Sequence, residues 1–362
     1  MGDEYSTIRA AAVQSASVFL DREASIETAC RLIREAGANG ARLIAFPESY
    51  IPGHPIWFHL RPATDRVSAR LSVELFKNAV EIPGPHIEPL QQAARDAKAN
   101  VVIGLCEKLP GTFGTLYNTQ LFIGSDGSLL GRHRKIMPTG IEKLIHTGGT
   151  GDGLLAFETD FGRTSALICG ENSNPLAIFT MTAQYPLVHV QSWPNYFPPV
   201  AGPIAERVKM DAQSFAQMSK AWIVAACGII DDRLVEMLEL DRAQEEVLRD
   251  PGKCGGSMIV DPLSRVVAGP LGNEEAILYA DMDLEMGLRV KLRHDFAGHY
   301  NRADIFEFKV NMGADRIVPL PSIGGDAGRG VLQFTAPRSL TASPEPAAEL
   351  NGEPFSDGAS PA

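Results

Sequence analysis

Several features are scarce or missing in this chain of 362 residues, and each excludes a class of protein. The five cysteines are odd in number, lie far apart and never form a CxxC pair. That distribution favours reduced thiols in a cytosol over a disulfide framework or a zinc knuckle. The histidines show no HExxH motif and no tight cluster, so we expect no metal site.

Long apolar runs and basic segments are also lacking. No apolar run approaches the roughly 20 residues that span a bilayer, and the polar start lacks the core of a secretion signal. The formal net charge is -11, and the one short basic run is 132–135. This acidic balance argues against nucleic acid or an anionic membrane surface as the main partner. We therefore expect a cytoplasmic protein that binds neither nucleic acid nor membranes.

What is present is an alternation of strands and helices. Apolar runs at 8–13, 42–46 and 101–105 predict buried strands, with helical periodicity between them. The runs 117–123 and 129–134, joined by turn residues, predict a hairpin. Because crossovers and hairpins both occur, the sequence predicts a layered α/β domain with mixed sheets.

The regular pattern ends near residue 312. We expect one domain over 1–312 and a C-terminal extension over 313–362. From about residue 335 the extension is rich in Ala, Pro, Ser and Glu and has no apolar period. That composition is typical of a disordered, acidic tail.

One apolar run ends abruptly in a residue that can be a nucleophile. Residues 166–168 are followed by Cys169 and Gly170, which is typical of a buried strand that delivers a thiol into a turn. A free thiol has a pKa of about 8.5, so it needs a neighbouring base or cation before it attacks. Taken alone, Cys169 is more simply interpreted as a small residue of the core.

Two other segments offer the partners that such a thiol needs. Glu48 follows an apolar strand and a proline, so it lies either on the surface or at the floor of a cleft, where desolvation raises its pKa. Lys135 ends the basic run, which is either a solvated edge strand or a strand whose alternation turns Lys135 inward and the arginines outward. An inward ammonium beside a carboxylate can stabilise a thiolate and then a developing anion.

Three further segments allow more than one interpretation. Glu142 is either a second carboxylate of the same cleft or an exposed loop charge. His54 belongs to a loop with aromatic residues and is interpreted as a pocket or surface residue rather than a metal ligand. The glycine-rich segment 148–153 lacks the Gly-Lys-Ser/Thr of a phosphate loop, so we interpret it as a turn.

In this order, the segments resemble the nitrilase superfamily of carbon–nitrogen hydrolases, over roughly residues 8–308. The matching motifs are Phe46-Pro47-Glu48, Arg134-Lys135 with Pro138-Thr139, and Cys169-Gly170-Glu171-Asn172. Glu142 falls where the family carries a second glutamate. Glu171-Asn172 and the loop 52–57 resemble the nitrilase branch more than the amidase and carbamoylase branches. The chain departs from the commonest nitrilase pattern at Gly170, His54 and Ala303, where tryptophan, tyrosine and proline are frequent.

The resemblance implies a four-layer αββα sandwich with mixed sheets. Members pair as homodimers, and nitrilases often build larger homo-oligomers or spirals; helix 203–219 and the segment after Asp304 are our candidates for subunit contacts. The implied catalytic residues are Glu48, Lys135, Cys169 and Glu142. The implied substrate-binding residues are His54, Trp57, Gly170 and Trp193.

The activity that follows is hydrolysis of an organic nitrile to a carboxylic acid and ammonia, through a covalent thioimidate and thioester on Cys169. No cofactor is expected, because the thiol supplies the covalent step. Three alternatives remain: an amidase or carbamoylase on the same fold, a cyanide-degrading enzyme, and a filament-forming or binding protein without turnover. The intact Glu48, Lys135 and Cys169 argue against the last.

Overall fold

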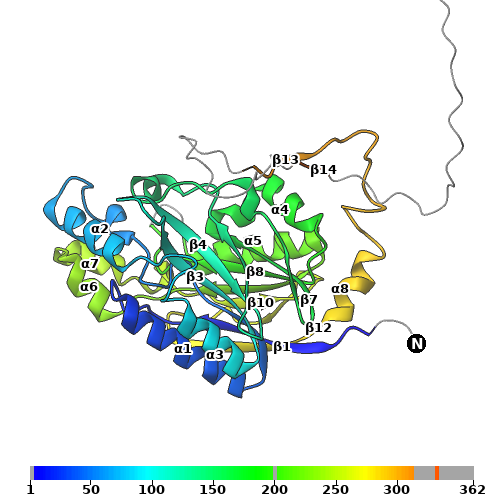
Figure 1. Ribbon diagram of the computed structural model, residues 1–362, viewed down its shortest axis with the longest axis horizontal. Helices are drawn as coiled ribbons and strands as arrows, with labels where there is room; N and C mark the ends of the chain where they lie inside the picture. Colours follow the sequence, from blue (N-terminus) through cyan, green and yellow to red (C-terminus); the bar gives the residue numbers. More distant parts are fainter. Residues whose placement is uncertain (1–3, 199–201, 314–330, 334–362) are drawn as a thin grey trace, which may run out of the picture.

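The computed structural model describes residues 4–198, 202–313 and 331–333, and two six-stranded sheets form its centre (Figure 1). The first sheet has the order β12-β1-β2-β3-β4-β5 and the second has the order β11-β10-β9-β8-β7-β6. The strands of the first sheet are β1 (Thr7–Gln14), β2 (Ala41–Ala45), β3 (Asn100–Lys108), β4 (Leu116–Ile123), β5 (Leu129–Arg134) and β12 (Ala276–Asp283). Those of the second are β6 (Phe157–Thr159), β7 (Gly162–Ile168), β8 (Val188–Trp193), β9 (Trp222–Cys227), β10 (Met258–Val260) and β11 (Val266–Ala268).

Both sheets are mixed, as the sequence predicts. Strands β1, β2 and β3 run parallel, and β12, β4 and β5 are added antiparallel. The second sheet repeats this plan, with β7, β8 and β9 parallel and β6, β10 and β11 antiparallel. A separate small sheet pairs β13 (Lys309–Asn311) with β14 (Val331–Gln333).

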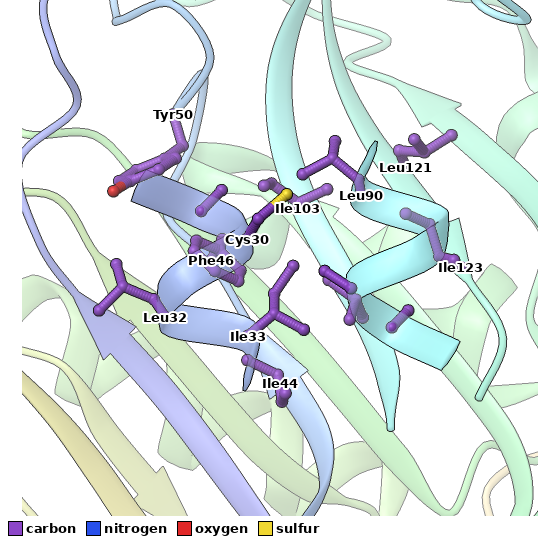
Figure 2. Packing of buried hydrophobic residues seen from close by; sticks show 14 of the residues in the cluster. Cys30, Leu32, Ile33, Ile44, Phe46, Tyr50, Leu90, Ile103, Leu121 and Ile123 are labelled. Carbon is purple, nitrogen blue, oxygen red and sulfur yellow. The ribbon is translucent and has the colours of Figure 1, made fainter. Parts of the chain in front are cut away.

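Two helices cover the outer face of the first sheet (Figure 1). The helix α1 (Arg22–Ala38) begins where the Asp21 side chain accepts a hydrogen bond from the backbone N–H of Ala24. It lies beside α3 (Glu88–Ala97). Figure 2 shows the apolar layer beneath them, in which side chains of both helices pack on those of β2, β3 and β4.

The other layers follow the same principle. Helices α4 (Pro175–Thr182) and α5 (Ile204–Ser219) pack on the second sheet through their own apolar cluster. A third cluster fills the space between the sheets, and it includes Ala10, Leu43, Val102, Phe122, Val190, Val224 and Ile259. Three apolar layers thus separate four layers of secondary structure, and the predicted four-layer αββα sandwich is confirmed.

The remaining helices lie at the ends of the sandwich. Helices α2 (Arg66–Asn78), α6 (Asp232–Leu238) and α7 (Arg242–Leu248) share one apolar cluster at one end, and α8 (Leu284–Lys291) follows β12 (Figure 1). Among the described residues, no helix is both long enough and apolar enough to cross a membrane. The tail expected from about residue 335 lies outside the described residues.

Candidate active site

Glu48 lies just beyond β2, where the two sheets meet. Its backbone N–H donates to the carbonyl of Trp193, 3.1 Å away at the end of β8 in the other sheet. A glycine makes this path possible, because a Cβ on Gly104 of β3 would lie only 2.2 Å from the carbonyl oxygen of Pro47 and 2.9 Å from the Cα of Glu48. The sequence thus folds Glu48 into the seam between the sheets.

Lys135 follows the edge strand β5. The side chains of His133 and Lys135 are 0% and 1% exposed, whereas those of Arg132 and Arg134 are 35% and 19% exposed. The alternation that the sequence suggests therefore holds, and Lys135 points inward. Its backbone N–H donates to the carbonyl of Asn118 on the neighbouring strand, at 2.8 Å.

Cys169 follows β7 directly and is the first residue of a short 3-10 helix, η4 (Cys169–Ser173). Its φ of +50° places a residue other than glycine in the left-handed region. That conformation costs about 1 kcal/mol, so the surroundings must hold it. Asn172 does so in part, because its Nδ2 donates to the carbonyl of Cys169 at 2.9 Å. The turn places Cys169 on the wall of a cavity.

Glu171 ties the turn of Cys169 to the segment of Lys135. Its carboxylate accepts hydrogen bonds from the backbone N–H of Ile136 at 2.7 Å and from that of Ile168 at 2.9 Å. A third contact, of 2.8 Å, joins it to Nε2 of His133. The backbone N–H groups next to Lys135 and next to Cys169 therefore both donate to one buried carboxylate, that of Glu171.

The Lys135 ammonium lies between two buried carboxylates. Its Nζ is 2.7 Å from Oε1 of Glu48 and 2.6 Å from Oε2 of Glu142. Burial disfavours the charged lysine, but the two carboxylates raise its pKa well above the ordinary value. Asn118 joins the same carboxylates, donating from Nδ2 to Glu48 at 2.6 Å and to Glu142 at 2.8 Å.

The two carboxylates differ in their surroundings. Glu142 also accepts from the backbone N–H of Thr139 at 2.9 Å and contacts Nδ1 of His146 at 3.0 Å. Burial acts to raise the pKa of Glu142, but Lys135 and His146 hold it below the ordinary value. Oε2 of Glu48 has no hydrogen-bond partner among the described residues, and burial raises the pKa of Glu48 to about 7 despite Lys135.

The thiol of Cys169 is neutral in this environment. Burial and the nearby Glu48 carboxylate raise its pKa above the ordinary value, and Lys135 opposes the shift. Glu48 also lines the cavity, and with one oxygen that has no partner among the described residues and a pKa of about 7 it can accept a proton near neutral pH.

These groups line one cavity of about 280 Å³. Its walls are formed by Glu48, His54, His59, Lys135, Thr139, Glu142, Cys169, Gly170, Trp193, Pro194, Tyr196, Phe197, Pro198 and Arg207. His54 lies with Nδ1 3.9 Å from Oε1 of Glu48, and burial lowers its pKa to about 3, so its ring is neutral.

Of the residues that the sequence singles out for the pocket, Trp57 does not line this cavity. It is fully buried in the apolar cluster at the end of the molecule, where it packs against Phe19 and Phe58. Sequence reasoning missed Asn118 and His146, which contact the carboxylates. One signal for Glu142 was also missed. Thr139 and Glu142 have the spacing of a capping box, and the structure forms this capping box at the start of a short 3-10 helix.

Within residues 4–198 and 202–313, no three or more His, Cys, Asp or Glu side chains are grouped so as to hold a metal ion. All five cysteines are buried and free.

Comparison with known proteins shows to which family the chain is similar. A family model described as carbon–nitrogen hydrolase matches residues 9–291. Nitrilase 2 from an unknown prokaryotic organism is 34% identical over 310 residues, which cover 85% of this chain and 94% of that protein. An arylacetonitrilase from Aspergillus kawachii is 35% identical over 307 residues, which cover 83% of this chain and 90% of that protein. An aliphatic nitrilase from Rhodococcus rhodochrous is 33% identical over 316 residues, which cover 85% of this chain and 84% of that protein.

Solved structures of the superfamily share the fold. Nit3 of Saccharomyces cerevisiae, a member of branch 10 of the nitrilase superfamily, matches with a TM-score of 0.61 at 21% identity, covering 79% of this chain and 94% of that chain. A carbon–nitrogen hydrolase from Helicobacter pylori matches with a TM-score of 0.62 at 19% identity, covering 83% and 97%. At these identities the likeness concerns the fold alone.

Proposed function

The chain belongs to the carbon–nitrogen hydrolase family, and on that premise we propose that it is a nitrilase, which hydrolyses an organic nitrile to a carboxylic acid and ammonia. Relatives that are 33% to 35% identical carry the names nitrilase, arylacetonitrilase and aliphatic nitrilase, which supports the nitrile as substrate class. The observation that carries the proposal is the arrangement of Glu48, Lys135 and Cys169 on one cavity wall.

The first half of the reaction forms a covalent adduct. Oε2 of Glu48 takes the proton of the Cys169 thiol while the sulfur attacks the nitrile carbon, which forms a C–S bond and breaks one π bond of the nitrile. The nitrile nitrogen receives that electron pair and then the proton, giving a thioimidate. The Lys135 ammonium has three N–H donors, of which the two carboxylates take two, so the third can stabilise the nitrogen. The backbone N–H of Gly170, which lines the cavity, is the second donor that we assign to this role.

The second half releases the products. A water molecule gives a proton to Glu48 as its oxygen adds to the thioimidate carbon, and Glu48 passes that proton to the nitrogen. The C–N bond of the adduct then breaks as the new hydroxyl loses its proton to the departing nitrogen, which releases ammonia and leaves a thioester on Cys169. A second water then hydrolyses the thioester to the acid and restores the thiol. Glu142 is saturated with hydrogen bonds, so we assign it to holding Lys135 rather than to proton transfer. His54 and Trp193 form part of the wall around the substrate.

Ammonia release from a panel of aromatic, arylacetic and aliphatic nitriles tests the proposal, with the matching amides and free cyanide in parallel. We expect turnover of nitriles by the native chain and a loss of several orders of magnitude in Cys169→Ala, which should keep its fold. Cys254→Ala is a matched control, because Cys254 is also a buried free thiol but does not line the cavity. Turnover of amides or cyanide alone would point to the alternative activities, and undiminished turnover by Cys169→Ala would remove Cys169 from the mechanism.

We also propose that the chain forms a homo-oligomer in the cytoplasm, built from homodimers. Exposed apolar side chains lie on α4, α5 and the segment after Asp304, at Leu176, Met210, Ile305 and Phe306. A cavity of about 340 Å³ with a largely apolar lining lies between α4 and residues 296–306. Light scattering during size-exclusion chromatography measures the assembly, and a monomer at micromolar concentration would contradict this part of the proposal.

A further inference from the structure

His146 contacts the Glu142 carboxylate of the site but does not itself line the cavity. It follows the short 3-10 helix η2 (Gly140–Leu144), is 3% exposed and lies beside Leu116 at the start of β4. Its Nδ1 is 3.0 Å from Oε1 of Glu142, and its Nε2 is 3.4 Å from the sulfur of Cys106. Cys106 belongs to β3 and is completely buried.

The hydrogen-bonding chemistry of the two neighbours matches one tautomer of the imidazole ring. The Glu142 carboxylate is ionised and can only accept a hydrogen bond, so Nδ1 of His146 must carry a proton and donate it. In a neutral imidazole the other nitrogen is then an acceptor. Burial raises the pKa of Cys106 above the ordinary value, so Cys106 remains a thiol, whose S–H can donate to Nε2. One tautomer of His146 therefore satisfies both contacts.

A continuous chain of hydrogen bonds results. It runs from Cys106 through His146 to Glu142, and from Glu142 to the Lys135 ammonium. Glu142 sits on the short helix η2, and its carboxylate can hold Lys135 only while it keeps one orientation. Two donors, Asn118 and His146, fix Oε1, the oxygen that does not contact Lys135.

We propose that His146 is a positioning residue for the hydrolysis. It holds the Glu142 carboxylate, and through it the Lys135 ammonium, in the place from which Lys135 stabilises the substrate nitrogen, while Cys106 selects the required tautomer. This inference rests on the proposed function. It goes beyond that function because it concerns residues that do not touch the substrate. Neither His146 nor Cys106 lines the cavity.

Two polar substitutions of His146 separate positioning from simple packing. An asparagine amide nitrogen stands close to where Nδ1 stood and can donate to Glu142, whereas a glutamine amide reaches toward the place of Nε2 and Cys106. We expect His146→Asn to keep most of the native kcat. We expect His146→Gln to lose kcat by about 10- to 100-fold, the factor that corresponds to one hydrogen bond to a charged group. The KM for the nitrile should change little in either variant, because ground-state binding is untouched.

Steady-state kinetics on the best nitrile and the melting temperature of each variant are the measurements. Equal kcat in the two variants, whether both native-like or both impaired, would overturn the positioning role. A rise in KM at native kcat would also overturn it. Cys106→Val provides an independent arm that leaves His146 in place; it should lower kcat less than His146→Gln does, and a larger loss would overturn the tautomer assignment. If the native chain turns over no nitrile, the proposed function fails first, and this outcome is distinct from the others.

Discussion

At the scale of single residues, one ammonium is shared by two carboxylates that have become chemically different. Glu142 has hydrogen bonds on both oxygens, and its pKa lies below the ordinary range although burial opposes this. Glu48 has one oxygen without a partner among the described residues, and burial raises its pKa to about 7. The same side chain type therefore yields a permanent anion at one position and a proton acceptor at the other.

The raised pKa of Glu48 predicts how the rate depends on pH. Below about 7 Glu48 is protonated and cannot accept the thiol proton, so kcat/KM for a nitrile should fall as pH decreases through neutrality. Above that value Glu48 is ionised and the rate should level off. Initial rates in overlapping buffers measure this decrease of kcat/KM at low pH. We expect Glu48→Gln to abolish turnover at every pH.

Glu107 provides the control for that experiment. Glu107 is also fully buried, but it pairs with Arg132 and Arg134 and does not line the cavity. Glu107→Gln should therefore show the same pH dependence of kcat/KM as the native chain. A native chain whose kcat/KM stays constant across neutral pH would contradict the assignment of Glu48 as the base.

At the scale of elements, the site depends on one connection between the end of β5 and the helix η4. Glu171 accepts the backbone N–H groups next to Lys135 and next to Cys169, together with the contact to His133. The chain beyond β5 is irregular at Ile136, and the φ of +50° at Cys169 has to be held by contacts of this kind. Glu171 therefore links two segments that lie more than thirty residues apart in the sequence.

Glu171→Gln should disrupt this connection at nearly constant side-chain volume. One carboxylate oxygen becomes an NH₂ group that faces an N–H donor, so we expect a loss of about 1–3 kcal/mol in the free energy of unfolding. We also expect slower alkylation of Cys169 by iodoacetamide and a lower kcat, because thiol and ammonium lose their common anchor. Denaturant titration and the alkylation rate measure the two effects. Glu158→Gln on the surface should change neither, since its side chain is 68% exposed; a native alkylation rate in Glu171→Gln would contradict the linking role.

Much of this element-level arrangement can be read from the sequence, and the reasons for the exceptions are physical. The apolar runs 8–13 and 42–46 place β1 and β2 within one residue, because a buried strand needs a run of apolar residues, and the predicted hairpin strand 129–134 coincides with β5. Helices α6 and α7 were not predicted. Each has only seven residues, and the aspartates that cap them, Asp231 and Asp241, are common in loops as well.

Some residues of the candidate site can likewise be predicted from the sequence, and others cannot. Alternation along β5 indicates that Lys135 points inward, and an apolar strand followed by a turn indicates that Cys169 stands at the end of β7, where it lines the cavity. No local pattern reveals Asn118 or His146, because a single amide in a strand or a single imidazole in a loop belongs to no sequence motif. Their role comes from tertiary contacts with Glu48, Glu142 and Cys106. Trp57 shows the reverse error, since an aromatic residue in a loop near Glu48 packs into a core cluster instead.

At the scale of the whole molecule, the site exists only where the two sheets are stacked. Glu48 and Lys135 come from the first sheet, whereas Cys169 comes from the second. The layer between the sheets is mostly apolar, and apolar contacts alone do not fix how far one sheet slides over the other. Polar contacts near the site do: Nε2 of Gln120 on β4 donates to Oγ of Ser192 on β8 at 2.8 Å, and that hydroxyl donates to the carbonyl of Phe46 at 2.8 Å.

Ser192→Ala removes this link between the sheets and leaves buried polar groups without partners. We expect it to lower the free energy of unfolding by about 1–3 kcal/mol and also to lower kcat, because Phe46 lies two residues before Glu48. Ser25→Ala is the matched control, since Ser25 is equally buried and its hydroxyl donates one hydrogen bond, of 3.0 Å to the carbonyl of Val18, within the layer of α1. Both variants should lose stability in denaturant titrations, but only Ser192→Ala should lose kcat at temperatures where it is fully folded. Equal kcat in the two variants would mean that the position of Glu48 does not depend on this contact between the sheets.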